Sequence, residues 1–255
     1  MADTIFMIHG MWVGSWVWDN YISFFESKGY HCVAPTLRFH DMDPASVPDP
    51  RLGRMSLSDF ADDLEEEIKG LPEKPVLMGH SMGGLVAQLL VSRRLAKSAV
   101  LLTPAPPAGR PAFSPTVLYN FATKLRVPAF LGDKPFRPPF SGVTSTIFNR
   151  CPENEWQANY NRFVFESGRV IREIGMWFLD PRRASRVDAS TVTCPTLVVS
   201  GSHDKCVIPS VARRIADKYR HVSTYKEFPD HAHMVLTEPG WPDVASYVAD
   251  WLESR

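Results

Sequence analysis

The sequence predicts an α/β fold: a mostly parallel sheet with helices on both faces and a helical cap insertion. Two observations carry that prediction. Short apolar runs alternate with segments of helical periodicity over residues 1–103 and again over residues 191–255. Such alternation is typical of parallel strands joined by crossover helices. Between these parts, in residues 104–190, the alternation stops and prolines and aromatic residues recur. We therefore expect a core formed by 1–103 and 191–255, with 104–190 as a helical cap, or lid.

Composition narrows the possible partners. With 255 residues the chain can form one large domain, and its 28 basic and 28 acidic residues give a net charge of zero. That balance favours neither nucleic acid nor an anionic membrane. No apolar stretch approaches the length of a membrane span. The run Ile5–Ile8 is too short for a signal peptide, and the four cysteines form no Cys-x-x-Cys pair. We expect a cytoplasmic protein with reduced thiols, no membrane partner and no metal site; nothing specifies its oligomeric state.

The first elements follow from apolar runs and turn residues. Thr4–Ile8 is apolar enough for a buried strand and leads into the turn His9–Trp12. Trp16–Ser27 has helical spacing and Gly29 is a typical stop, after which Cys32–Pro35 is predicted as a second strand.

A polar, proline-bearing loop precedes the next helix, which opens near Ser56 and places Phe60, Leu64 and Ile68 on one face. The remaining core elements are predicted by the same criteria. They are the strands Pro75–Met78, Ser98–Leu102, Pro195–Val199 and Ser223–Phe228 and the helices Leu85–Leu95, Val211–Lys218 and Pro242–Leu252.

The aromatic residues of the cap have two interpretations. Most are expected to form the small core of a helical unit. A few are expected to line a pocket between cap and sheet, because apolar ligand sites favour such interfaces. Our candidates for pocket residues are Trp12, Trp156 and Trp177.

The most informative motif is Gly79–Gly84, Gly-His-Ser-Met-Gly-Gly, directly after the apolar run Pro75–Met78. A serine with a glycine two positions away on either side, on a sharp turn from a strand to a helix, is typical of a nucleophile elbow. Ser81 would be the nucleophile, and the backbone N–H of Met82 would lie at the positive start of the helix. The alternative is an ordinary buried serine in a strand-to-helix turn.

A serine nucleophile needs a base and an orienting acid, which follow the elbow in the order acid, then histidine. Asp204 lies in a Gly-containing turn after a predicted strand, although an aspartate there could simply cap the turn. His231 and His233 both lie after the last predicted strand.

With these motifs in order, the chain resembles the α/β-hydrolase superfamily over nearly its whole length apart from the cap. Its opening His9–Trp18 resembles the plant methylesterase and hydroxynitrile lyase branch. The resemblance implies that the N–H of Met11 is a second oxyanion donor beside that of Met82. It also implies a catalytic histidine followed by a short apolar run and Glu-Pro, which favours His233 over His231.

The other histidines have simpler roles. His9 and His80 flank the proposed catalytic groups, and we expect them to hydrogen bond to loop backbone rather than act as bases. His203 adjoins Asp204, but no second pair at ligand spacing supports a metal site.

The resemblance implies a serine hydrolase that needs no cofactor, and cleavage of a carboxylic ester is the reaction that fits most simply. The apolar, aromatic-rich cap indicates an uncharged, hydrophobic small-molecule substrate of small to medium size. Met234 and Gly10 occupy positions where hydroxynitrile lyases of the branch carry lysine and threonine, which disfavours cyanohydrin cleavage. Haloalkane dehalogenases and epoxide hydrolases carry aspartate at the elbow, where this chain has Ser81. Carbon–carbon bond hydrolysis, cofactor-free perhydrolysis and a ligand-binding receptor on a hydrolase scaffold remain alternatives.

Overall fold

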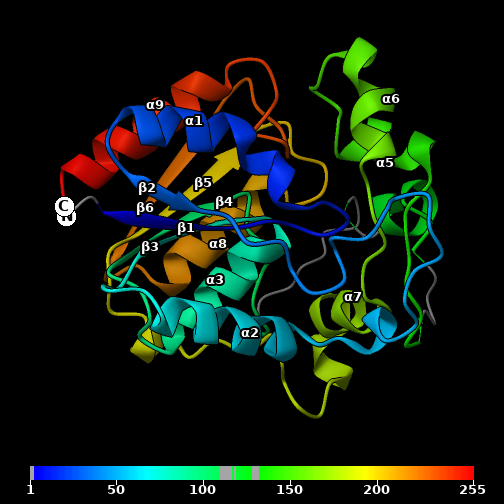
Figure 1. Ribbon diagram of the computed structural model, residues 1–255, viewed down its shortest axis with the longest axis horizontal. Coiled ribbons are helices and arrows are strands. Elements are labelled where there is room, and N and C mark those ends of the chain that lie inside the picture. The colour runs from blue at the N-terminus through cyan, green and yellow to red at the C-terminus, as the bar shows by residue number, and fades with distance from the viewer. Residues whose placement is uncertain (1–2, 110–116, 118, 128–131) are drawn as a thin grey trace.

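A single parallel sheet organises the protein, as seen in a computed structural model that describes residues 3–109, 117, 119–127 and 132–255 (Figure 1). Its six strands are hydrogen bonded in the order β2-β1-β3-β4-β5-β6, and every pair is parallel. The α/β prediction is therefore confirmed. The strands are β1 (Thr4–Ile8), β2 (His31–Val33), β3 (Val76–His80), β4 (Ser98–Leu102), β5 (Thr196–Gly201) and β6 (Ser223–Phe228).

Helices cover both faces of this sheet, and each face has its own apolar core. The alternation of side chains along β1 shows this, because Phe6 and Ile8 belong to one core while Ile5 and Met7 belong to the other. Helices α2, α3 and α8 cover the first face and α1 and α9 cover the second (Figure 1). These helices are α1 (Asp19–Ser27), α2 (Leu57–Lys69), α3 (Met82–Ser92), α8 (Pro209–Lys218) and α9 (Trp241–Glu253).

The predicted helix boundaries differ from the structure by up to three residues, and two of the differences change the local structure. The segment predicted as one helix from Trp16 begins with a single 3-10 turn, Ser15–Trp18 (η1), before α1. Helix α3 begins at Met82 rather than Leu85, because Gly83 and Gly84 form its first turn. The second difference matters for function, since it places the Met82 amide at the start of the helix.

The segment between β4 and β5 lies at one end of the sheet, with α5 and α6 to one side of the strands and α7 below them (Figure 1). Residues 110–116, 118 and 128–131 of the predicted cap lie outside the described part of the chain. The elements described between β4 and β5 are η3 (Asn120–Lys124), α5 (Phe140–Thr146), α6 (Glu153–Asn161), α7 (Gly168–Gly175), η4 (Trp177–Leu179) and η5 (Ala189–Thr191), and the turn η2 (Leu52–Arg54) precedes α2.

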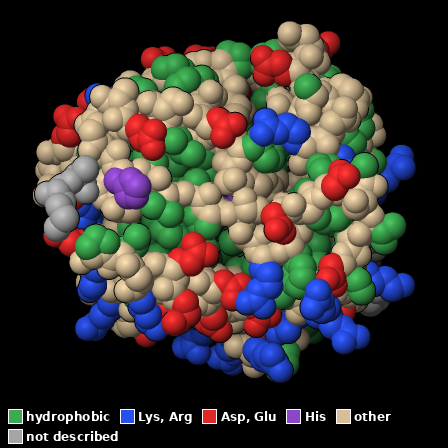
Figure 2. Space-filling model, in the orientation of Figure 1, with side chains coloured by type: hydrophobic (Ala, Val, Ile, Leu, Met, Phe, Trp, Pro, Cys, Tyr) green, Lys and Arg blue, Asp and Glu red, His purple; other side chains and the backbone are tan. Residues whose placement is uncertain are grey.

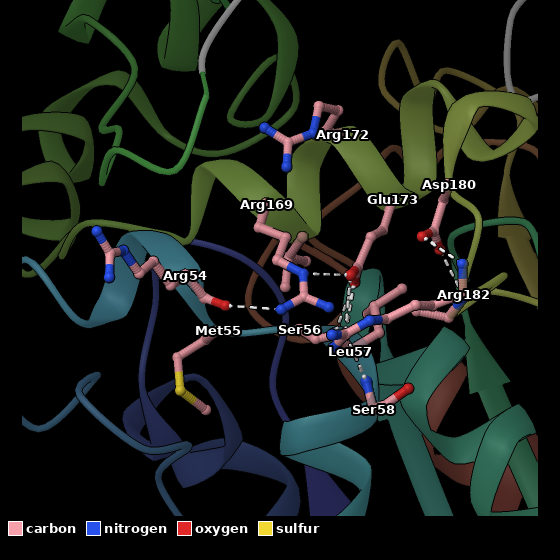
Figure 3. Close-up of polar contacts among 12 residues, drawn as sticks. Arg54, Met55, Ser56, Leu57, Ser58, Arg169, Arg172, Glu173, Asp180 and Arg182 are labelled. Carbon is pink, nitrogen blue, oxygen red and sulfur yellow. Dashed lines mark hydrogen bonds and ion pairs between the residues drawn. The ribbon is translucent and has the colours of Figure 1, made fainter.

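A buried carboxylate joins this segment to the core (Figure 3). Glu173 of α7 accepts hydrogen bonds from the Ser56 hydroxyl at 2.8 Å and from the Leu57 amide at 2.9 Å, at the N-terminus of α2. Arg169, one turn earlier, donates to Glu173 at 2.8 Å and to the Arg54 carbonyl at 3.2 Å. Burial raises the pKa of Glu173. Helix α7 thus supplies an acceptor for amides that the first turn of α2 leaves unpaired.

The surface is mixed in charge. Figure 2 shows acidic side chains spread over the visible face and basic side chains mostly along its lower edge, and the net charge of the chain is zero. Within the described ranges, no helix is both long enough and apolar enough to cross a bilayer.

Candidate active site

Ser81 stands on a strained turn between β3 and α3. Its backbone has φ 55° and ψ −119°, in a region that residues with a side chain rarely adopt. Close backbone packing holds the turn, since a side chain at Gly79 would collide with the backbone of Gly83. A side chain at Gly83 would collide with the backbone of Ile8. The small residues of the motif are therefore required by the approach of three backbone segments around Ser81.

A chain of hydrogen bonds runs from Ser81 into the protein. His233 Nε2 lies 3.0 Å from Ser81 Oγ, and His233 Nδ1 lies 2.8 Å from Asp204 Oδ2. The other oxygen of Asp204 accepts from the amides of Cys206 at 2.7 Å and Val207 at 2.8 Å. Asp204 and His233 are both buried. This arrangement has the connectivity by which a histidine can take a proton from a serine while an aspartate orients it.

The second histidine of the same loop points elsewhere. His231 Nδ1 lies 3.4 Å from Glu238 Oε1, and its ring packs edge-on against Phe228 at a centroid distance of 5.6 Å. The structure thus brings His233, and not His231, to Ser81.

Two backbone amides lie beside Ser81. Met82 is the first residue of α3, where an amide has no acceptor within the helix. Met11 lies in the turn after β1, and its amide has no acceptor among the described residues. Gly10 lets that turn approach, because a Cβ at Gly10 would lie only 3.0 Å from Ser81 Cβ. The Met82 amide and the turn that carries the Met11 amide therefore lie next to Ser81, on two different segments of the chain.

A cavity of about 250 Å³ adjoins these groups, between the ends of the strands and the segment that follows β4. Ser81 and His233 lie in its wall together with Trp12, whose indole N–H donates to the Phe136 carbonyl at 3.1 Å. Other lining side chains are mostly apolar. They include Phe121, Val127, Ile147, Phe163, Ile171 and Met176.

Two of the three aromatic residues predicted for the pocket do not line it. The Trp156 indole donates to the carbonyls of Phe148 at 3.2 Å and Cys151 at 3.0 Å, which directs the ring toward the loop between α5 and α6 and away from the cavity lining. Trp177 lies in η4 and packs edge-on against Phe178. Trp12 alone of these candidates faces the cavity.

His9 and His80 hydrogen bond to loop backbone, as the sequence predicts. His9 Nδ1 donates to the Gly10 carbonyl at 2.9 Å and its Nε2 accepts from the Leu37 amide at 3.0 Å. His80 Nε2 lies 2.9 Å from the His233 carbonyl. Burial lowers the pKa of both residues to about 3, so both are neutral at ordinary pH and neither serves as a base.

Cys206 adjoins the site without being an alternative nucleophile. Burial, with the neighbouring Asp204 carboxylate, raises the pKa of its thiol well above the usual value, so the thiol stays protonated. Asp204, Cys206 and His233 place three potential ligand atoms within 4.8 Å of one another, the one such group in the described part of the chain. Asp204 and His233 are already hydrogen bonded to each other, which accounts for the cluster.

The contact between Thr103 and His233 was not predicted from the sequence. The hydroxyl of Thr103, just after β4, donates to the His233 carbonyl at 3.1 Å. These residues are separated by 130 positions, and a single threonine at a strand end carries no motif. The only sequence signal is its place between a buried strand and Pro104.

Comparisons with known proteins agree with this architecture. A sequence model described as the Alpha/beta hydrolase family matches residues 5–241. Polyneuridine aldehyde esterase of Rauvolfia serpentina is 32% identical over 82 residues, which are 31% of this chain and 29% of that protein. Less than a third of that relative is therefore aligned. Non-heme chloroperoxidase of Burkholderia pyrrocinia is 26% identical over 254 residues, covering 92% of this chain and 87% of that protein.

Solved structures show the same fold. The crystal structure of the methylesterase MES16 from Arabidopsis superposes with a TM-score of 0.74, covering 100% of both chains at 12% sequence identity. At that identity the likeness concerns the fold, so the chemistry has to be argued from the site.

Proposed function

The chain belongs to the alpha/beta hydrolase family, and from that premise we propose that it is a serine hydrolase cleaving carboxylic esters through an acyl-enzyme. The observation that carries the proposal is the hydrogen-bonded chain from Ser81 through His233 to Asp204, opening into an apolar cavity. The names of two similar proteins, a methylesterase and polyneuridine aldehyde esterase, support ester chemistry.

In the proposed mechanism His233 takes the proton of Ser81 as Oγ attacks the ester carbonyl. The amides of Met11 and Met82 donate to the oxygen that becomes negative, each worth roughly 3 kcal/mol in the transition state. His233 then gives its proton to the departing alcohol. Water next attacks the acyl-serine with His233 again as the base. The acyl–Oγ bond then breaks, the carboxylic acid leaves, and His233 returns the proton to Ser81, while Asp204 keeps the imidazole oriented in both halves.

The cavity supports an uncharged, hydrophobic substrate of small to medium size. Its volume is about 250 Å³ and its walls are mostly apolar. Arg172, a charged side chain in the lining, pairs with Asp133 at 3.0 Å, so its charge is already compensated. A hydrophobic acyl or alcohol group gains free energy by leaving water for such a site, at about 25 cal/mol for each Å² buried.

Steady-state hydrolysis of p-nitrophenyl esters, from acetate to octanoate, tests the proposal. We expect wild-type turnover with a chain-length optimum set by the cavity, and loss of turnover in Ser81→Ala with an unchanged circular dichroism spectrum and Tm. Turnover that survives in Ser81→Ala would contradict the mechanism. A folded wild type that performs at most one slow turnover would favour a ligand-binding receptor, or a carbon–carbon hydrolase that needs a different substrate.

Perhydrolysis is the second candidate, favoured by the similarity to a non-heme chloroperoxidase over 92% of this chain. In that reaction hydrogen peroxide replaces water as the attacking group on the acyl-serine, and the product is a peracid. It uses the same residues and no cofactor. Peracid formation from an acetate ester and hydrogen peroxide, dependent on Ser81, would establish it; hydrolysis without peracid would leave esterase activity alone.

A further inference from the structure

We propose that Thr103 and His80 are positioning residues, which together hold the backbone carbonyl of His233 and thereby keep its imidazole on Ser81. The His80 Nε2–H donates to that carbonyl at 2.9 Å and the Thr103 hydroxyl donates at 3.1 Å. All three side chains are buried. The inference rests on the proposed function, because it assigns a purpose to the placement of the base.

Thr103 carries a second, independent mark of constraint. Its φ is 44°, although a β-branched residue is strongly disfavoured in the left-handed region. Its amide donates to the Val199 carbonyl at 2.8 Å, and Pro104 follows, so the strand end fixes this conformation. Strain of this kind persists where the surroundings over-determine it, and it clusters at functional sites. Here the residue with the constrained backbone is the one whose hydroxyl donates to the His233 carbonyl.

The neutral His80 ring carries its proton on Nε2 and donates it to the His233 carbonyl. Its Nε2 faces a carbonyl oxygen, which can only accept, so Nε2 carries the proton. Its Nδ1 is buried and has no partner among the described residues. Because burial lowers the pKa of His80 to about 3, the ring stays neutral and the hydrogen bond persists wherever the enzyme is expected to work.

The two donors lie at the ends of strands that do not neighbour β6, the strand before the histidine loop. His80 ends β3 and Thr103 follows β4, whereas His233 lies beyond β6 at the edge of the sheet. Ser81 follows His80 directly. The His233 backbone is therefore anchored to the end of β3, which carries the nucleophile, and to the end of its neighbour β4.

Asp204 by itself leaves the imidazole free to move. It holds Nδ1, at one point of the ring, about which the ring can pivot. A fixed carbonyl supplies a second point at the backbone end of the side chain. Two anchors maintain the 3.0 Å separation between Nε2 and Ser81 Oγ, and proton transfer in the transition state depends on such geometry.

The test uses Thr103→Val and Thr103→Ser as a matched pair. Valine keeps the shape and the β-branch but loses the donor, whereas serine keeps the donor. We expect Thr103→Val to lower kcat about tenfold, with KM changed by less than about twofold, and Thr103→Ser to stay within about threefold of the wild type. His80→Phe should resemble Thr103→Val. The double variant should lose more than the product of the two single losses, because it alone leaves the buried carbonyl without either donor.

A second readout separates this inference from the proposed function. A fluorophosphonate probe phosphonylates an active serine with loss of fluoride, and the base receives the serine proton. Labelling of Ser81 in Thr103→Val should slow about tenfold, in parallel with kcat. Equal labelling rates and equal kcat in wild type and Thr103→Val would overturn the positioning role alone, as would a lower Tm with unchanged rates. If Thr103→Val does not fold, His80→Phe provides the same comparison. A wild type that is never labelled would overturn the proposed function and the positioning role with it.

Discussion

Ser81 has an unfavourable backbone conformation that is stabilised by closely packed neighbouring backbone segments. Its φ of 55° would not persist without the close contacts that Gly79 and Gly83 permit on either side. The strain presents Oγ to the cavity and places the next amide at the start of a helix. The conformation of this residue therefore depends on glycines that do not line the cavity.

The two histidines of the loop after β6 give a sharp test at the same scale. We expect His233→Ala to lower kcat at least about 10³-fold, because Ser81 then has no base. His231→Ala should leave kcat within about threefold, since its ring packs against Phe228 and approaches Glu238. Both variants are compared by ester turnover, with Tm measured in parallel. The opposite ranking would reassign the base to His231.

Sequence and structure agree on the residues that belong to strong local patterns. Ser81 has its glycines, Asp204 follows the apolar strand β5, and His233 follows β6, the last strand, so chain order alone brings these residues to one end of a parallel sheet. Trp156 illustrates the converse. Which way an aromatic side chain points depends on tertiary neighbours, here two carbonyls, that no local pattern encodes.

At the scale of elements, the joint between α2 and α7 depends on one carboxylate (Figure 3). We expect Glu173→Ala to lower the free energy of unfolding by about 2 kcal/mol, because the Leu57 amide and the Ser56 hydroxyl lose their buried acceptor. Glu173→Gln keeps an acceptor of similar shape and should cost less. Urea denaturation of both variants measures the difference, and equal losses would show that the hydrogen bonds contribute little.

The strands and helices of the core were predictable from the sequence. For the segment after β4, the sequence predicted helices but not where each one begins and ends. Strands such as β3 and β4 are fully buried, so their apolar runs are unambiguous. Helix α6, in contrast, has no buried residue. A helix without a buried face gives no 3.6-residue apolar period, which is why its bounds do not follow from the residues alone.

For the whole molecule, three buried histidines with shifted pKa values contribute to the dependence of stability on pH. His9 and His80 are neutral in the folded protein with pKa values of about 3, against an ordinary value of 6.5. Below about pH 6.5 these two histidines bind protons in the unfolded chain but not in the folded protein. The free energy of unfolding therefore decreases as pH falls.

His40 acts in the opposite direction. Burial alone would lower its pKa, but the Glu166 carboxylate at 3.0 Å and the Arg38 carbonyl at 3.1 Å raise it above 6.5. Asp41 adds to this rise, while the neighbouring His9 ring is neutral and Phe60 is uncharged. A raised pKa stabilises the folded state fully below the unfolded value, and this stabilisation is lost as pH rises through the folded pKa.

We therefore expect the free energy of unfolding to fall on both sides of a maximum near neutral pH. Removing the titrating group in His40→Gln should flatten the decline on the alkaline side of the ordinary histidine pKa and leave the acid decline in place. Urea denaturation as a function of pH provides the measurement. An alkaline slope that is identical in wild type and His40→Gln would show that the His40–Glu166 pair does not titrate there.

The most direct measurement is the identification of the acyl-enzyme. Wild-type protein would be mixed with a p-nitrophenyl ester, quenched in acid within the first turnovers, digested and analysed by mass spectrometry. The proposed mechanism predicts the mass of the acyl group on the peptide that contains Ser81, and no adduct in Ser81→Ala. Rapid turnover with an acyl group on another residue, such as Cys206, would contradict it.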